Sequence, residues 1–408
     1  RTSTFDAVTP FSAVTTPPYD QYHTSAPMAA ISGTARDPSN NSATFINDVG
    51  IVVRNLSGPT SYWNDGSQVW QVAASTKDVG PFSATPISWG FTPSDANVFW
   101  VPNTSYTVTS MARDDSNFPV VDGNKEASPP SRMIIYDGLS PNATIQRPVA
   151  GEFYNKWSKP LVTISGTMTD SVPGEIQKVV VKIQSGTANS YWDGGVWNTG
   201  ISSLNATLGF GTTNWSYGIP HAAWDDGNTY RIFALAVDKA SNNAVGYTVA
   251  GGDAHILKSF RMDTTSPTAV MTYPTHCTPD CTPDIISVSA VSATVTEANL
   301  QTVEFSMQRV ADSFWLTPGA TAFFSAPAEV FITGTQVGAV WHLMTNGVAA
   351  WDNGDYQVYV RATDQATNVS HKLGSPGVGS AWIQFTVESP QPTSYIQKPP
   401  NDSFDNNH

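Results

Sequence analysis

A motif of one acidic residue followed by two prolines, here called the acid–proline motif, recurs four times along the chain. It constrains the fold more than any other feature. The first proline follows the acid by four positions, and the second follows the first by seven. The four copies are Asp6/Pro10/Pro17, Asp137/Pro141/Pro148, Asp263/Pro267/Pro274 and Glu388/Pro392/Pro399. Proline has no backbone N–H to give to a sheet, so it fits a linker or an edge strand. The spacing of 125 to 131 residues between copies predicts tandem domains.

The four copies of the acid–proline motif predict the domain boundaries. Three complete repeats span residues 11–140, 141–266 and 267–391. Residues 1–10 match the last strand of a preceding repeat with its linker, and residues 392–408 match the start of a following repeat. Domains of this length are ordinary for a chain of 408 residues.

A tyrosine is the strongest landmark within each repeat. Each of Tyr106, Tyr230 and Tyr356 is followed by an alanine six positions later and by an aspartate eight positions later. Other segments alternate apolar and polar residues, which is typical of strands with one buried face, and Asp-Gly or Gly-Gly steps indicate hairpin turns. No helical period of comparable length occurs. The sequence predicts an all-β fold of tandem sandwiches in a linear array, with seven to nine strands in each.

Charge and composition exclude several classes of partner. The net charge is −13, with 20 basic and 33 acidic residues, which argues against nucleic acid or an anionic membrane surface as partner. No apolar run approaches the roughly 18 residues of a transmembrane helix, so we do not expect the chain to be embedded in a membrane. The two cysteines, Cys277 and Cys281, predict a local disulfide in an oxidising compartment. Half of a metal site is the other interpretation of this pair.

Two kinds of segment resemble a known fold. Asp352–Tyr356, and less closely Asp226–Tyr230, resembles the tyrosine corner of immunoglobulin-like domains. The endings Ala236–Asn242 and Ala362–Asn368 share the pattern Ala-x-Asp-x-Ala-x-Asn. Together with the linker Asp263–Pro267 they look like the bacterial immunoglobulin-like, or cadherin-like, tandem repeats of large extracellular surface proteins. The resemblance implies immunoglobulin-like sandwiches, an extracellular location and a structural role for the three tyrosines.

The sequence gives no sign of catalysis. It contains no zinc-protease helix motif, no nucleophile elbow, no phosphate-binding loop and no dinucleotide fingerprint. His221 lies near Asp225, but this pair is interpreted as a surface loop residue beside a turn. We therefore expect a protein that is not an enzyme and that requires no cofactor.

Calcium is the metal for which the sequence offers candidate ligands. In cadherin-like arrays, acids at domain ends hold Ca²⁺ between neighbouring repeats, so the resemblance implies that recurring acids could do so here. The other interpretation, which the sequence favours, is that the strand-end aspartates form turns by binding backbone N–H groups. The candidate ligands are Asp37, Asp114, Asp137, Asp170, Asp238, Asp263, Glu297, Asp364 and Glu388.

Aromatic residues recur at one hairpin of every repeat, as Tyr62-Trp63, Tyr191-Trp192 and Phe314-Trp315. Such rings stack on sugars in carbohydrate-binding modules, but their repetition favours packing at the end of the sandwich. The candidate glycan-binding residues are Tyr62, Trp63, Trp70, Tyr191, Trp192 and Trp197.

These observations favour an extracellular structural or spacer segment of a cell-surface stalk, adhesin, filament or sheath protein. The alternative is an array of glycan-binding modules that accompanies a polysaccharide-active enzyme. The expected partners are the neighbouring repeats of the same chain, with further copies in a filament or surface layer, or a glycan, as alternatives.

Overall fold

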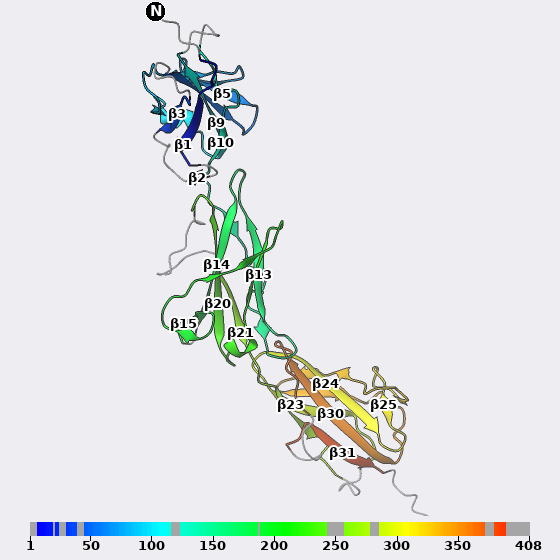
Figure 1. Cartoon of the computed structure of the whole chain (residues 1–408). Coiled ribbons are helices and arrows are strands. Elements are labelled where there is room, and N and C mark those ends of the chain that lie inside the picture. Colours follow the sequence, from blue (N-terminus) through cyan, green and yellow to red (C-terminus); the bar gives the residue numbers. More distant parts are fainter. Residues whose placement is uncertain are drawn as a thin grey trace, which may run out of the picture. The chain divides into compact units, whose positions relative to one another are not determined.

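The computed structural model describes residues 6–18, 21–23, 30–38, 45–115, 123–186, 188–242, 257–277, 285–371 and 379–388. Almost all regular structure in these residues is β-strand (Figure 1). The helical elements described are one four-residue α-helix, α1 (Ala96–Phe99), and one 3₁₀ turn (His221–Ala223). They are too short to cross a membrane. The predicted all-β fold is confirmed.

The strands of the first repeat form two sheets. Their bounds are β1 Phe11–Thr16, β2 Gln21–His23, β3 Ile31–Arg36, β4 Ile46–Asn55, β5 Ser61–Asn64, β6 Val69–Gln71, β7 Lys77–Val79, β8 Ile87–Phe91, β9 Thr104–Asp114 and β10 Ser131–Tyr136. One sheet has the order β1-β3-β8. The other has the order β2-β10-β9-β4-β5-β6, with β7 paired to β4.

The second repeat repeats this arrangement. Its strands are β11 Asn142–Ala143, β12 Phe153–Tyr154, β13 Thr163–Thr169, β14 Ile176–Ser185, β15 Ser190–Trp192, β16 Trp197–Asn198, β17 Leu204–Asn205, β18 Thr207–Leu208, β19 Asn214–Gly218, β20 Thr229–Asp238 and β21 Leu257–Met262. The sheets have the orders β11-β13-β19-β18 and β12-β21-β20-β14-β15-β16, with β17 on β14.

The third repeat also has two sheets. Its strands are β22 Thr268–Tyr273, β23 Ala290–Thr296, β24 Leu300–Arg309, β25 Phe314–Leu316, β26 Phe323–Phe324, β27 Ile332–Thr333, β28 Thr335–Val337, β29 Val340–Met344, β30 Gly354–Asp364 and β31 Trp382–Val387. The orders are β22-β23-β29-β28 and β26-β25-β24-β30-β31, with β27 on β24. Each repeat therefore has more strands than the predicted seven to nine, because the aromatic hairpins add short strands to the sheet edge.

Buried side chains from both sheets form the core of each sandwich. In the first repeat, Val14 and Ile31 of the small sheet belong to one buried cluster with Val49 and Val108 of the large sheet. The third repeat has an equivalent cluster from its two sheets. This two-sheet packing is that of an immunoglobulin-like sandwich.

By its internal contacts the chain divides into two compact units, each of which is described by itself. The first comprises Arg1–Ala150, Val162–Ala223 and Thr229–Ser259. The second comprises Gly151–Leu161, Trp224–Asn228 and Phe260–His408. No sheet among the described residues crosses Pro141 or Pro267. The domain boundaries read from the sequence stay predictions.

The three landmark tyrosines are fully buried. The hydroxyl of Tyr106 accepts a hydrogen bond from Val101 N (2.6 Å) and donates one to Val101 O (3.1 Å). That of Tyr356 donates to Asp352 O at 3.0 Å. The tyrosine corner is confirmed for these two residues, and it fixes the start of the strand that follows.

The predicted disulfide falls partly outside the described residues. Cys277 is disulfide-bonded, and its predicted partner Cys281 lies in the segment that is not described. The expected start of a following repeat, residues 392–408, is also outside the described residues.

Candidate metal centres

The last residue of the long tyrosine-bearing strand carries a carboxylate in every repeat. Buried and partly exposed residues alternate along β9, so Asp114 lies on the same buried face as Tyr106. Because side chains alternate with period two and the spacing of eight is even, the tyrosine and the aspartate must share a face. Asp238 ends β20 and Asp364 ends β30 in the same way, and both are buried. Each strand thus delivers a carboxylate to one end of its sandwich.

Asp6, Asp37 and Asp114 form the first acidic cluster. Asp37 directly follows β3, and Asp6 precedes β1. One oxygen from each carboxylate lies within 4.8 Å of the other two, and all three residues are buried. Asp6 is not among the acids predicted as ligands. The signal that identifies it is the acid–proline motif, in which Asp6 occupies the same position as Asp137.

Asp137, Asp170 and Asp238 form the second cluster. Asp137 directly follows β10, the last strand of the first repeat, whereas Asp170 follows β13 of the second repeat. Their carboxylate oxygens again lie within 4.8 Å of one another. Asp137 and Asp238 are fully buried. The cluster therefore joins the linker acid of one repeat to two acids of the next, which is the arrangement that the calcium interpretation requires.

The linker acids use one oxygen and leave the other without a protein partner. Oδ1 of Asp6 accepts a hydrogen bond from Val8 N at 2.8 Å, and Oδ1 of Asp137 accepts one from Leu139 N at 3.1 Å. Oδ2 of both residues is buried and has no hydrogen-bond partner in the described structure. A buried carboxylate oxygen without a partner is costly, because it has lost its hydration. These oxygens are therefore suited to a cation.

Asp238 combines the two roles that the sequence left open. Its Oδ1 accepts a hydrogen bond from Asn242 N at 2.7 Å, four residues on, so it forms a turn, although the sequence predicted a bond to the N–H two residues on. Its Oδ2, like Oδ2 of Asp170, is buried and has no hydrogen-bond partner among the described residues. Asn242 also donates from Nδ2 to Asp137 O at 3.0 Å, so it ties the turn to the linker. One oxygen of Asp238 forms the turn, and the other remains for the cluster.

The second cluster concentrates negative charge away from water. Burial, and then the charge of Asp137, raises the pKa of Asp170 to about 6. Burial also raises the pKa of Asp137, and the charge of Asp238 adds to this effect. No ion pair in the described residues neutralises these three carboxylates. Without a cation they repel one another, and a divalent cation would reverse that repulsion.

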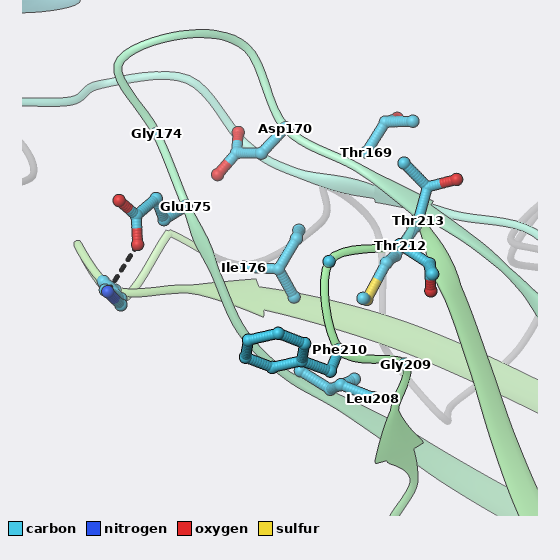
Figure 2. A pocket seen from close by; sticks show the side chains of 13 residues that line it. Thr169, Asp170, Gly174, Glu175, Ile176, Leu208, Gly209, Phe210, Thr212 and Thr213 are labelled. Atoms are coloured by element: carbon cyan, nitrogen blue, oxygen red, sulfur yellow. Dashed lines mark hydrogen bonds and ion pairs between the residues drawn. The ribbon is translucent and has the colours of Figure 1, made fainter.

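Gly174 lies against the oxygens of the second cluster. A Cβ at this position would lie 2.5 Å from Asp137 Oδ2 and 2.6 Å from Asp170 Oδ2. Figure 2 shows Asp170 and Gly174 on the two opposite sides of the loop that joins β13 to β14. Only glycine leaves room there for both carboxylates. The sequence gives a weak signal for this residue, because Pro173-Gly174 reads simply as a turn.

A cavity of about 750 Å³ lies beside the second cluster, and Asp170 is part of its wall. The same cavity is lined by Ile176, Leu208 and Phe210, which lie together in Figure 2. Phe210 is fully exposed to solvent. Asp170 therefore borders both the buried cluster and this cavity.

The third repeat does not assemble the predicted ligands in the same way. Among the described residues, Asp263, Glu297 and Asp364 are not part of a cluster of this kind. Asp263 Oδ2 accepts a hydrogen bond from Asn299 Nδ2 at 2.9 Å instead. Glu388 is exposed, and the residues that would follow it in a next repeat are outside the described part of the chain.

The recurring aromatic residues pack against the sandwich. Trp63, Tyr191 and Trp192 are buried. The Trp70 ring lies 5.5 Å from that of Tyr106, and the Trp197 ring lies 5.3 Å from that of Tyr230, between centroids. These contacts correspond to the packing interpretation for five of the predicted glycan-binding residues, whereas Tyr62 is partly exposed on β5.

Comparisons with known proteins leave the family open. No family model and no curated protein matches the chain. The chicken CNTN1 FN1–FN3 domains are 11% identical, with 91% of this chain and 97% of that chain covered and a TM-score of 0.29. The MG0-NIE-MG1 domains of Escherichia coli alpha-2-macroglobulin are 10% identical, with coverage of 84% and 92% and a TM-score of 0.20. Similarity at this level assigns no function.

Proposed function

We propose that this chain is a spacer segment of a large extracellular surface protein, in which calcium ions bind where successive immunoglobulin-like repeats join. The observation that carries the proposal is the buried carboxylate of Asp137. Its Oδ2 has no hydrogen-bond partner among the described residues, and one of its oxygens lies within 4.8 Å of carboxylate oxygens from the next repeat. An ion held there contacts the linker and the following sandwich together.

The chemistry of the donors favours calcium over other metals. All three side chains of each cluster are carboxylates, and hard oxygen donors suit Ca²⁺, which takes six to eight of them in flexible geometry. Zinc and copper favour histidine or cysteine ligands. Magnesium keeps most of its waters and demands near-octahedral geometry, so it fits a buried set of three carboxylates less well.

The position of the ligands supports a mechanical rather than a catalytic role for the ion. Asp137 belongs to the linker, and Asp170 and Asp238 belong to the sandwich that follows. Binding one ion therefore removes freedom at the linker. Extracellular calcium modules have dissociation constants of about 10⁻⁴ to 10⁻³ M, which matches an environment where calcium is abundant.

Thermal and chemical unfolding of residues 1–408 with and without calcium tests the proposal. At 10 mM Ca²⁺, a site with such a dissociation constant stabilises the folded state by about 1.4 to 2.7 kcal/mol. Chelator should remove this gain.

Asp137→Asn should remove most of the gain that the second cluster contributes, because the amide has no negative charge to hold the ion. Asp193→Asn is the matched control, since Asp193 is an exposed hairpin aspartate of the second repeat and lies outside both clusters. A chain whose stability is the same in calcium and in chelator refutes the proposal.

A further inference from the structure

The linker acid of the third repeat sits in a different environment from the other two. Oδ1 of Asp263 accepts a hydrogen bond from Thr265 N at 3.1 Å, just as Asp6 and Asp137 accept bonds from the N–H two residues on. The difference lies in Oδ2. Asn299 donates its side-chain amide to this oxygen in the third repeat, whereas the corresponding oxygens of Asp6 and Asp137 have no partner among the described residues.

Asn299 occupies the position that Glu175 holds in the second repeat. Asn299 O accepts a hydrogen bond from Gln365 N at 2.9 Å, and Glu175 O accepts the equivalent bond from Lys239 N at 2.8 Å. Glu175 directs its side chain into an ion pair with Lys239 (dashed line in Figure 2). Asn299 is instead buried against the linker acid. This backbone hydrogen bond is the same in the two repeats, and the side chain at the position decides what meets the linker acid.

Loop length brings Asn299 into place. Five residues separate Asp170 from Ile176 at the start of β14, whereas two separate Glu297 from Leu300 at the start of β24. In the short loop, Glu297 Oε1 accepts hydrogen bonds from Ala298 N (2.7 Å) and Asn299 N (3.2 Å). This carboxylate is therefore turned toward its own loop.

The strand-end aspartate of the third repeat is satisfied by an amide, as Asp114 of the first repeat is by Asn124. Asp364 Oδ1 accepts from Asn368 N, and Asp364 Oδ2 accepts from Asn368 Nδ2, both at 2.8 Å. Asn368 Nδ2 donates to Asp263 O as well, at 2.8 Å. The total negative charge of the three acids equals that of the other clusters. The hydrogen bond from Asn299 to Asp263 Oδ2, rather than charge or the strand-end turn, distinguishes this junction.

Direct hydrogen bonds from the second repeat complete the junction. Asn155 is buried, and its Nδ2 donates to Ala366 O at 2.7 Å and to Asn368 Oδ1 at 3.1 Å. Lys159 Nζ donates to Gln365 O at 3.2 Å. These residues belong to one compact unit. The loop between β12 and β13 thus holds the turn after β30 by direct hydrogen bonds.

We infer that the junction at Asp263 binds no calcium, because Asn299 places the positive end of an amide where the other junctions offer a vacant carboxylate oxygen. This rests on the proposed function for the first two junctions. The junctions at Asp6 and Asp137 then depend on calcium, whereas the junction at Asp263 does not. A cation at Asp263 would meet the amide hydrogens and be repelled.

Equivalent substitutions in the second and third repeats test the inference. Calcium binding to the whole chain is measured by isothermal titration, with circular dichroism to verify that each variant is folded. Asp170→Asn should weaken one site about tenfold or more, because ligand charge sets affinity. Glu297→Gln keeps the oxygen that accepts the two loop N–H groups, and it should change neither the number nor the affinity of bound ions by more than about twofold.

A third variant tests the role of Asn299 by gain of binding. Asn299→Asp should add one calcium ion per chain relative to wild type. Weakened calcium binding in Glu297→Gln, or an Asn299→Asp chain that gains no ion, overturns the inference while the proposed function stands. A wild-type chain that binds no calcium overturns the proposed function, and the contrast between the junctions falls with it.

Discussion

Replacing Gly174 with alanine reduces the space at the second cluster but leaves the charge of the cluster unchanged. The new Cβ would lie 2.5 Å from Asp137 Oδ2 and 2.6 Å from Asp170 Oδ2, and Cβ contacts below 3.0 Å essentially never occur. The φ of Gly174 is not in the left-handed region, so alanine strains no backbone torsion. Both oxygens must therefore retreat by about 0.5 Å, while every charge of the site remains.

The size of this retreat sets the expected effect. Calcium–oxygen distances in proteins span about 2.3 to 2.6 Å, a window of only about 0.3 Å. Two ligands that move by more than this window cannot both stay bound in place. We expect the calcium affinity of this site to fall at least about tenfold, which corresponds to about 1.4 kcal/mol.

Isothermal titration, together with urea unfolding in calcium and in chelator, measures this loss. Gly218→Ala is the matched control, because a Cβ at Gly218 has no atom within 4 Å. The Gly174→Ala chain should lose about 1 kcal/mol of its calcium-dependent stabilisation, and the control should lose none. Wild-type calcium affinity in the Gly174→Ala chain would show that the two oxygens are not ligands, and the reasoning from Oδ2 would be refuted.

Two further predictions concern pH and the tyrosine corners. In chelator, the free energy of unfolding should rise as pH falls from about 7 to 5. The raised pKa of Asp170 means that the folded chain binds this proton more tightly than the unfolded chain does. In saturating calcium the free energy of unfolding should instead fall as pH falls, since protons then compete with the ion. Urea midpoints across pH check both slopes, and parallel curves would contradict the assignment. Tyr356→Phe loses one hydrogen bond, to Asp352 O, and should cost about 1 kcal/mol. Tyr106→Phe loses two bonds to Val101 and should cost about 2 kcal/mol; equal losses in urea unfolding would show that the second bond contributes nothing.

Much of the fold follows from sequence because its signals are local. The even spacing from Tyr106 to Asp114 places both residues on one face of a strand, and alternation then decides that this face is buried. The strand count was underestimated, since strands of two to four residues leave no periodic pattern to detect.

The candidate sites were less predictable because they depend on contacts between distant segments. The sequence identified Asp170 and Glu297 as equivalent, but it does not show that one faces a cluster and the other bonds its own loop. That difference depends on loop length and on Asn299, whose role appears only when Asp263, 36 positions earlier, lies against it. The spatial meaning of Gly174 is likewise invisible until two carboxylates approach it.

The parallel pairing of early and late strands has a mechanical consequence. β2 runs parallel to β10, the last strand of its repeat, and β12 runs parallel to β21; in the third repeat, Cys277 and Ile285 form parallel bridges to β31. Tension applied through the two chain ends of such a repeat pulls neighbouring strands past each other along their length. The hydrogen bonds between them are then loaded together in shear instead of opening one after another. A repeat closed in this way resists stretching until the whole pairing gives way at once.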